Sequence, residues 1–91
     1  MIAAPNCIDG KPGSYWYLSR TTSFGRYYPT RVTLDYGINT VIWTRVFKHA
    51  MIFPSEHSIQ YFVSQRRWYG DKVEIVHIYR GSMKSIIQVN S

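Results

Sequence analysis

The segment HAMIFPSEHSIQYFV (residues 49–63) decides the fold class, because it contains the one helix that the sequence predicts. Pro54 ends the extended run before the helix, and Ser55 is a residue type that favours the N-cap position. Glu56 then lies in the first turn, where the helix dipole favours a negative charge. These signals predict a helix from about residue 56 to residue 67.

The spacing of apolar residues predicts which side of this helix is buried. Ile59, Phe62 and Val63 occur at i, i+3 and i+4, and the stem of Arg66 follows at i+7, so they form one stripe. The stripe is expected to lie on a sheet. The side chains expected to face water are those of Gln60, Gln65 and Arg67.

Five segments around the helix are rich in β-branched and aromatic residues, which favour strands. They are YWYLSR (15–20), TRVTLDY (30–36), TVIWTRVF (40–47), KVEIVHIYR (72–80) and SIIQV (85–89). TTSFGRYYP joins the first two, and turns are expected at 37–39 and at 81–82. The order βββαββ predicts an α+β fold: an antiparallel β-sheet of about five strands with one helix packed on one face.

One predicted strand shows which of its sides is apolar. Val32, Leu34 and Tyr36 alternate with Arg31, Thr33 and Asp35. Because successive side chains of a strand point to opposite faces, this alternation predicts one apolar face and one solvated face.

The length of 91 residues limits the chain to one modest core, because chains of this size bury only roughly 60–65% of their unfolded surface. We predict a single domain at 14–91 and a leader at 1–13 that is either loosely ordered or lies along the domain. With 45% apolar and 18% charged residues, the chain is expected to fold. It shows neither a membrane-spanning apolar run nor signal-peptide features, so we expect a cytoplasmic location. Cys7 has no partner for an internal disulfide and is interpreted as a bystander thiol.

Eleven Lys and Arg residues against five Asp and Glu residues give a net charge of +6, spread along the chain. Such a field speeds association with polyanions or acidic proteins. The alternative, that the charge binds nothing, stays open.

The sequence offers little for catalysis or metal binding. His49, His57 and His77 are eight and twenty residues apart, without a Cys or carboxylate pair spaced to complete a metal site. Five acidic residues scarcely allow a catalytic pair, and no phosphate-binding glycine loop or Gly-x-Ser-x-Gly elbow occurs. We therefore predict no enzymatic activity, no metal and no cofactor.

Basic and aromatic side chains interleave at residues 15–31 and 66–69, which is the strongest functional signal. Rings with cations between them suit single-stranded nucleic acid, and Tyr, Trp and Arg also dominate protein-binding hot spots. A competing interpretation assigns several rings, such as Trp16, Trp43 and Phe47, to the core. The candidate partner-binding residues, expected where core packing claims them least, are Arg20, Arg26, Tyr27, Tyr28, Arg31, Arg66, Arg67 and Trp68.

The segment WTRVFKHAMIFPSEHSIQYFV (43–63) resembles a layout of small tailed-phage accessory proteins: a strand with Trp, then A-x-x-F, a Ser/Thr cap and a helix. The resemblance implies that Ala50 and Phe53 pack the helix and that no residue is catalytic. Members of such sets, including anti-CRISPR and other host-takeover proteins, block a host protein or nucleoprotein complex stoichiometrically. The helix departs from the layout in lacking an Ala/Glu-rich composition.

The segment GDKVEIVHIYRGSMK (70–84) is similar to the last hairpin of RelE/ParE-type toxins. For a ribonuclease of that family, the resemblance implies that four residues bind phosphate and move protons: His77, Tyr79, Arg80 and Lys84. The family opens with a strand and a helical hairpin, whereas residues 14–47 here predict strands.

Three functional hypotheses follow. The first is a non-enzymatic phage-type inhibitor that binds a host protein or nucleoprotein complex, such as a CRISPR-type defence complex, in the host cytoplasm. The second is direct binding of single-stranded nucleic acid, and the third is a RelE-like ribonuclease toxin. A membrane partner is not expected. A homodimer is a further hypothesis, because the strand at 85–89 can form an open sheet edge.

Overall fold

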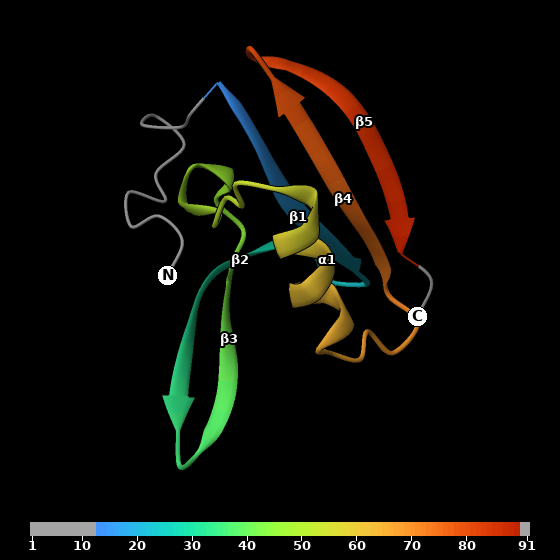
Figure 1. Cartoon of the computed structure of the whole chain (residues 1–91). Coiled ribbons are helices and arrows are strands. Elements are labelled where there is room, and N and C mark those ends of the chain that lie inside the picture. Colours follow the sequence, from blue (N-terminus) through green and yellow to red (C-terminus); the bar gives the residue numbers. More distant parts are fainter. Residues whose placement is uncertain (1–12, 90–91) are drawn as a thin grey trace.

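The computed structural model describes residues 13–89, which form one five-stranded antiparallel sheet and one helix (Figure 1). The α+β fold and the order βββαββ are therefore as predicted. The strand order in the sheet is β3-β2-β1-β4-β5. The elements are β1 (Ser14–Thr22), β2 (Gly25–Asp35), β3 (Ile38–Thr44), the 3-10 turn η2 (Phe47–His49), α1 (Glu56–Ser64), β4 (Lys72–Tyr79) and β5 (Ser82–Val89). The predicted leader, with Cys7, lies outside the described residues except for Gly13.

Strand β2 begins earlier than expected, at Gly25, so most of the segment predicted to connect two strands is itself a strand. This strand contains Pro29, which cannot donate a hydrogen bond to a neighbouring strand. Here it lies at an irregularity between Pro29 and Arg31, where β2 has left β1 and pairs with β3. The Pro29 carbonyl accepts a hydrogen bond from Met51 N at 2.7 Å.

β2 pairs only with the last residues of β1, from Arg20 to Thr22, so the first half of β1 has no strand partner on the side opposite β4. Phe53 takes this place: Trp16 N donates to Phe53 O at 2.9 Å and Phe53 N donates to Trp16 O at 2.8 Å. This bridge holds the segment before the helix against the middle of the sheet.

Helix α1 begins as predicted, and Ser55 Oγ accepts a hydrogen bond from Ser58 N at 3.1 Å. It ends at Ser64, three residues before the predicted end. Two carbonyls of its last turn are bound by side chains, because Arg66 Nη1 donates to Phe62 O and Trp68 Nε1 donates to Val63 O. The chain can therefore leave the helix without stranding these carbonyl groups.

The core lies between α1 and the sheet (Figure 1). The predicted stripe Ile59, Phe62 and Val63 is buried, and Gln60, Gln65 and Arg67 are exposed as expected. The central core residues are Leu18, Met51, Phe53, Ile59, Phe62, Val63, Trp68, Val73 and Ile75. Within residues 13–89, no helix has the length and apolar character needed to cross a membrane.

Beyond the irregularity at Pro29, β2 and β3 project from the body as a hairpin, which we call the arm (residues 31–42; Figure 1). The predicted apolar face of this hairpin is only partly buried. Val32 packs against the core, but Leu34 and Tyr36 are 69% and 104% exposed, so their expected burial is wrong. The hairpin is long enough to carry them past the edge of the core.

The arm turns at Tyr36 and Gly37, not over 37–39. Both residues have positive φ, 50° and 78°, which is the geometry of a two-residue turn whose twist matches that of the strands. The β4–β5 hairpin repeats this device at Arg80 and Gly81, one residue before the predicted turn.

Candidate binding surface

Arg20 is held at the centre of a cluster formed by β1, β3 and the connection between α1 and β4. Its guanidinium lies 5.2 Å from the ring centroid of Trp43 and 5.4 Å from that of Trp68. Both Nε and Nη2 lie 2.8 Å from Asp71 Oδ2. Arg20 therefore stabilises the fold through cation–π contacts and an ion pair, and its charge is neutralised.

Trp68 belongs to the core, so its predicted exposure is wrong. Only 3% of its surface is accessible, and its ring meets Trp43 edge to face at a centroid distance of 6.0 Å. The chain leaves the helix three residues earlier than predicted, which turns the indole inward, where its N–H binds Val63 O at 3.3 Å.

Arg66 and Arg67 follow the helix. Unlike the charge of Arg20, their charges are not neutralised by a carboxylate among the described residues. Arg66 Nη1 lies 2.8 Å from Phe62 O, and its guanidinium carbon is 3.9 Å from the Phe62 ring centroid. Burial lowers the pKa of Arg66, but an arginine so placed remains charged at neutral pH. Arg67 is exposed. Within residues 13–89, neither forms an ion pair with a carboxylate.

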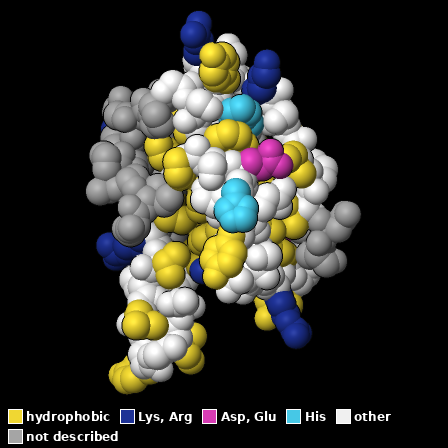
Figure 2. Space-filling view, viewed as in Figure 1, with side chains coloured by type: hydrophobic (Ala, Val, Ile, Leu, Met, Phe, Trp, Pro, Cys, Tyr) yellow, Lys and Arg dark blue, Asp and Glu magenta, His cyan; other side chains and the backbone are white. Residues whose placement is uncertain are grey.

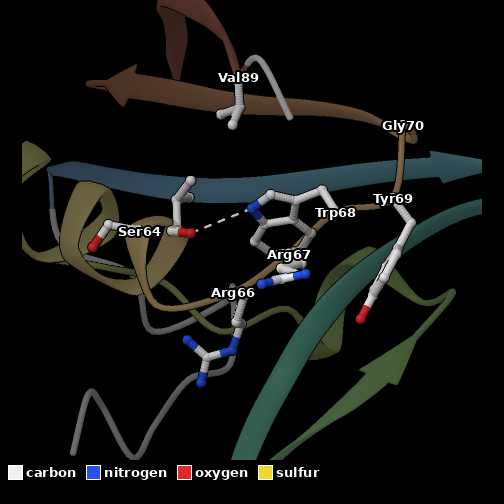
Figure 3. Close-up of a pocket in the computed structure, with 8 residues that line it drawn as sticks. Ser64, Arg66, Arg67, Trp68, Tyr69, Gly70 and Val89 are labelled. Atoms are coloured by element: carbon white, nitrogen blue, oxygen red, sulfur yellow. Dashed lines mark hydrogen bonds between the residues drawn. The ribbon is translucent and has the colours of Figure 1, made fainter.

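These residues line a groove beside β3, which we call the arginine groove: Arg20, Trp43, Arg66, Arg67 and Trp68. Its volume is about 290 Å³, and Asn39, Thr40 and Val41 complete the wall. A cavity of about 520 Å³ adjoins it, because Arg66, Arg67 and Trp68 line both. Figure 3 shows Val89 of β5 pointing toward the Trp68 indole, with both arginines on the other side of the ring.

A further cavity of about 470 Å³ extends the groove past Arg20 toward the β1–β2 turn. Its wall includes Tyr27 and Phe24, and Phe24 is 77% exposed. Arg45 Nη2 donates to Tyr27 Oη at 2.8 Å and to Phe24 O at 2.6 Å. Arg45 is not among the predicted partner-binding residues, because nothing in the sequence indicates that it lies beside Phe24 and Tyr27.

The eight predicted partner-binding residues do not form one surface. Five line the arginine groove and its adjoining cavities: Arg20, Tyr27, Arg66, Arg67 and Trp68. Arg26 and Tyr28 flank Tyr27 in β2 and so point to the opposite face of the sheet. Arg31 is exposed on the arm.

On that opposite face, Tyr28 is part of an aromatic cluster with Tyr17 and Phe47. The ring centroid of Tyr17 lies 4.7 Å from that of Phe47 and 6.0 Å from that of Tyr28. Burial raises the pKa of the Tyr17 phenol, and the neighbouring Tyr28 raises it further. The cluster packs β1 and β2 against η2, so Tyr28 has a structural role.

The residues suspected of ribonuclease chemistry, His77, Tyr79, Arg80 and Lys84, lie on the β4–β5 hairpin. His77 stacks on Trp16 with a centroid distance of 3.9 Å, and its Nε2 lies 3.0 Å from Ser14 Oγ. The Arg80 guanidinium lies 5.3 Å from the ring centroid of Tyr79. Within residues 13–89, no group of three or more His, Cys, Asp or Glu side chains could hold a metal ion.

Comparison with protein-family models, curated proteins and solved structures gave no match.

The Arg20–Asp71 contact makes a testable contribution to stability. Asp71→Asn is expected to lower the free energy of unfolding by about 1–2 kcal/mol, because it leaves a half-buried guanidinium without its counter-ion. Lys72→Met is the control, since Lys72 Nζ is mostly exposed and lies 3.9 Å from Glu74, and we expect a change of no more than about 0.5 kcal/mol. Urea unfolding measures both, and equal effects would show that the Arg20–Asp71 pair does not stabilise the fold.

Proposed function

We propose that this chain is a non-enzymatic binding protein that docks on a host protein complex through the arginine groove and blocks it. The observation that carries the proposal is the groove itself: two arginines without a carboxylate partner among the described residues, beside a wall that includes the half-buried Trp43. Arginine next to aromatic surface is the composition of protein-binding hot spots. An acidic protein face fits this groove.

The state of the aromatic rings favours a protein partner over nucleic acid. Base stacking requires free ring faces. In the groove, however, Trp43 and Trp68 pack against each other beneath Arg20, and in the adjoining cavity the centroid of the Tyr27 ring lies 5.0 Å from the Arg45 guanidinium. Figure 2 shows Lys and Arg side chains as separate spots on the visible face, whereas a polyanion is best bound by a continuous basic track.

The likeness of residues 43–63 to phage accessory proteins supports an inhibitor of host-takeover type. That layout packs the helix through Ala50 and Phe53, which are 0% and 3% exposed here. The proposed target is a nucleic-acid-handling or CRISPR-type defence complex in the host cytoplasm, and an acidic face on that complex would attract a chain with a net charge of +6. Blocking such a target needs no catalytic group.

The proposal is tested by affinity capture from bacterial lysate with the tagged chain and two charge-reversed variants. Arg67→Glu reverses a charge in the groove, and Arg26→Glu reverses an exposed charge on the opposite face of the sheet. We expect the wild-type chain and Arg26→Glu to retain the same protein at near-equal stoichiometry, and Arg67→Glu to lose it. Recovery of no stoichiometric protein by the wild-type chain would overturn the proposal.

Direct nucleic-acid binding is the main competing outcome. It predicts micromolar or tighter binding of a single-stranded oligonucleotide, with an affinity that falls steeply as salt rises. Under our proposal, fluorescence anisotropy of a labelled oligonucleotide stays flat at physiological salt. If the titration is saturable and salt-sensitive, and Arg67→Glu weakens the binding, the groove binds nucleic acid and not a protein.

A further inference from the structure

The outer edge of the sheet at β3 has none of the usual protection against pairing with another strand. β3 is the last strand of the sheet, and its sequence, INTVIWT, contains neither a charged residue nor a proline. Sheets normally guard such edges with lysine, proline or a bulge. The opposite edge, β5, has both Lys84 and an irregularity opposite His77 and Ile78. The open edge predicted at 85–89 is therefore the better protected of the two.

The register of the arm shows which backbone groups of β3 point outward. Asp35 and Ile38 flank the two-residue turn, where the paired residues exchange hydrogen bonds, and the pairs along the arm then alternate. Asn39, Val41 and Trp43 fall in the intervening positions, so their N–H and C=O groups point away from β2. Among residues 13–89, no backbone hydrogen bond occupies these outward groups.

The partner of Trp43 supports this orientation independently. Trp43 lies opposite Pro29, which has no N–H group to donate. The Pro29 carbonyl is bound by Met51 N at 2.7 Å, on the side of β2 away from β3. The backbone groups of Trp43 therefore face the outer edge of the sheet.

The unpaired cations lie beside the same stretch of β3. The side chains of Asn39, Val41 and Trp43 share one face of the strand, and they line the arginine groove together with Arg66 and Arg67. Neither arginine has a carboxylate partner among the described residues. A row of outward-pointing backbone groups thus adjoins two charges that are not neutralised.

We infer that β3 accepts an extended acidic segment of the target as an added strand, and that Arg66 and Arg67 bind alternate carboxylates of that segment. The inference rests on the proposed function and names the part of the target that the groove binds. Alternate side chains of the added strand face the groove about 7 Å apart, so the backbone bonds give affinity and the arginines select acids. The side chains between them lie beside Thr40 and Ile42, which suits β-branched residues.

An acidic strand fits this edge better than a second copy of the chain does. β3 contains no Asp or Glu, so a β3 strand added to the edge brings no carboxylate to Arg66 or Arg67. A strand with acids at alternate positions supplies both the hydrogen-bonding groups and the counter-charges.

The first test is a fluorescence anisotropy titration of the labelled peptide Glu-Val-Glu-Thr-Glu-Val-Glu with the full chain at physiological salt. We expect saturable binding with a dissociation constant on the order of 1–100 μM. The same peptide with Lys in place of Glu should not bind. Absence of binding by the acidic peptide would overturn the inference.

N-Methylation of the peptide tests strand pairing without any change to the protein. Only every second N–H group of an added strand points to its neighbour. Methylating one alternate set of peptide amides should therefore abolish binding, and methylating the other set should change the dissociation constant by less than about threefold. Equal effects of the two sets would contradict strand pairing.

Two proline variants test the edge of the protein. Asn39→Pro removes an outward N–H of β3 and should weaken peptide binding about tenfold or more, while leaving the bonds to β2 intact. Met83→Pro is the matched control, because Met83 is likewise the second residue after its turn, in the opposite edge strand. It should change binding by less than about twofold. Arg67→Glu is expected to weaken binding about tenfold or more.

The outcomes separate this inference from the proposed function. If affinity capture recovers a host protein and Asn39→Pro retains it as well as Met83→Pro does, the proposed function stands and the inference is wrong. If capture recovers no protein, the proposed function fails whatever the peptide titration shows. A dimer in sedimentation equilibrium that Asn39→Pro abolishes would assign the edge to a second copy and would also overturn the inference.

Discussion

Replacing Trp68 with alanine is expected to lower the free energy of unfolding by about 3–5 kcal/mol, because the ring is 3% exposed and occupies the centre of the core beneath Arg20. The substitution also removes the edge-to-face contact with Trp43 and the donor to Val63 O. Chemical denaturation with guanidinium chloride measures this loss. Tyr61→Ala on the exposed side of α1 is the control, with an expected change of no more than about 0.5 kcal/mol.

The result separates the core role of Trp68 from the surface role that the sequence predicted for it. A surface ring at a binding hot spot would leave stability nearly unchanged when truncated and would reduce target binding directly. If Trp68→Ala unfolds at the same denaturant concentration as the wild type, the inward orientation of the indole is wrong.

Leu18→Ala is expected to lower the free energy of unfolding by about 2–5 kcal/mol, because Leu18 is completely buried in the central strand β1, on the side covered by the helix. Leu34→Ala is the matched control: the same substitution in the same sheet, at a side chain that is 69% exposed on the arm. We expect it to change stability by no more than about 0.5 kcal/mol. Similar losses at both positions would mean that the arm packs on the body instead of projecting from it.

The sequence predicted those parts of the fold that local chemistry determines. Pro54 and Ser55 mark the start of α1, and the apolar stripe from Ile59 to Val63 marks its buried side. β-Branched and aromatic runs located all five strands. The end of α1 was predicted three residues too late, because it depends on the side chains of Arg66 and Trp68, which bind carbonyls of the last turn.

The candidate site was predicted only in part, because sequence distance does not show which strand faces meet. Tyr27 and Tyr28 are neighbours in β2, yet one lines a cavity beside the groove and the other packs on the opposite face. Arg20 and Arg66 are far apart in sequence but line one groove, since β4 and the connection before it return beside β1. No periodicity in the chain contains that information.

The burial of several aromatic side chains follows from the small size of the chain. A chain of 91 residues can fill one core only by using most of its large side chains, so Trp68 is needed inside. Basic and aromatic residues in one segment therefore predict a binding surface less well than exposed arginines beside a groove do.

The most direct test of the central claim is a calorimetric titration of the captured host complex with the wild-type chain, Arg67→Glu and Arg26→Glu. A binding site in the arginine groove predicts one saturable event, weakened about tenfold or more by Arg67→Glu and less than about twofold by Arg26→Glu. Equal weakening by the two variants, or a larger effect of Arg26→Glu, would contradict the assignment of the groove as the binding surface.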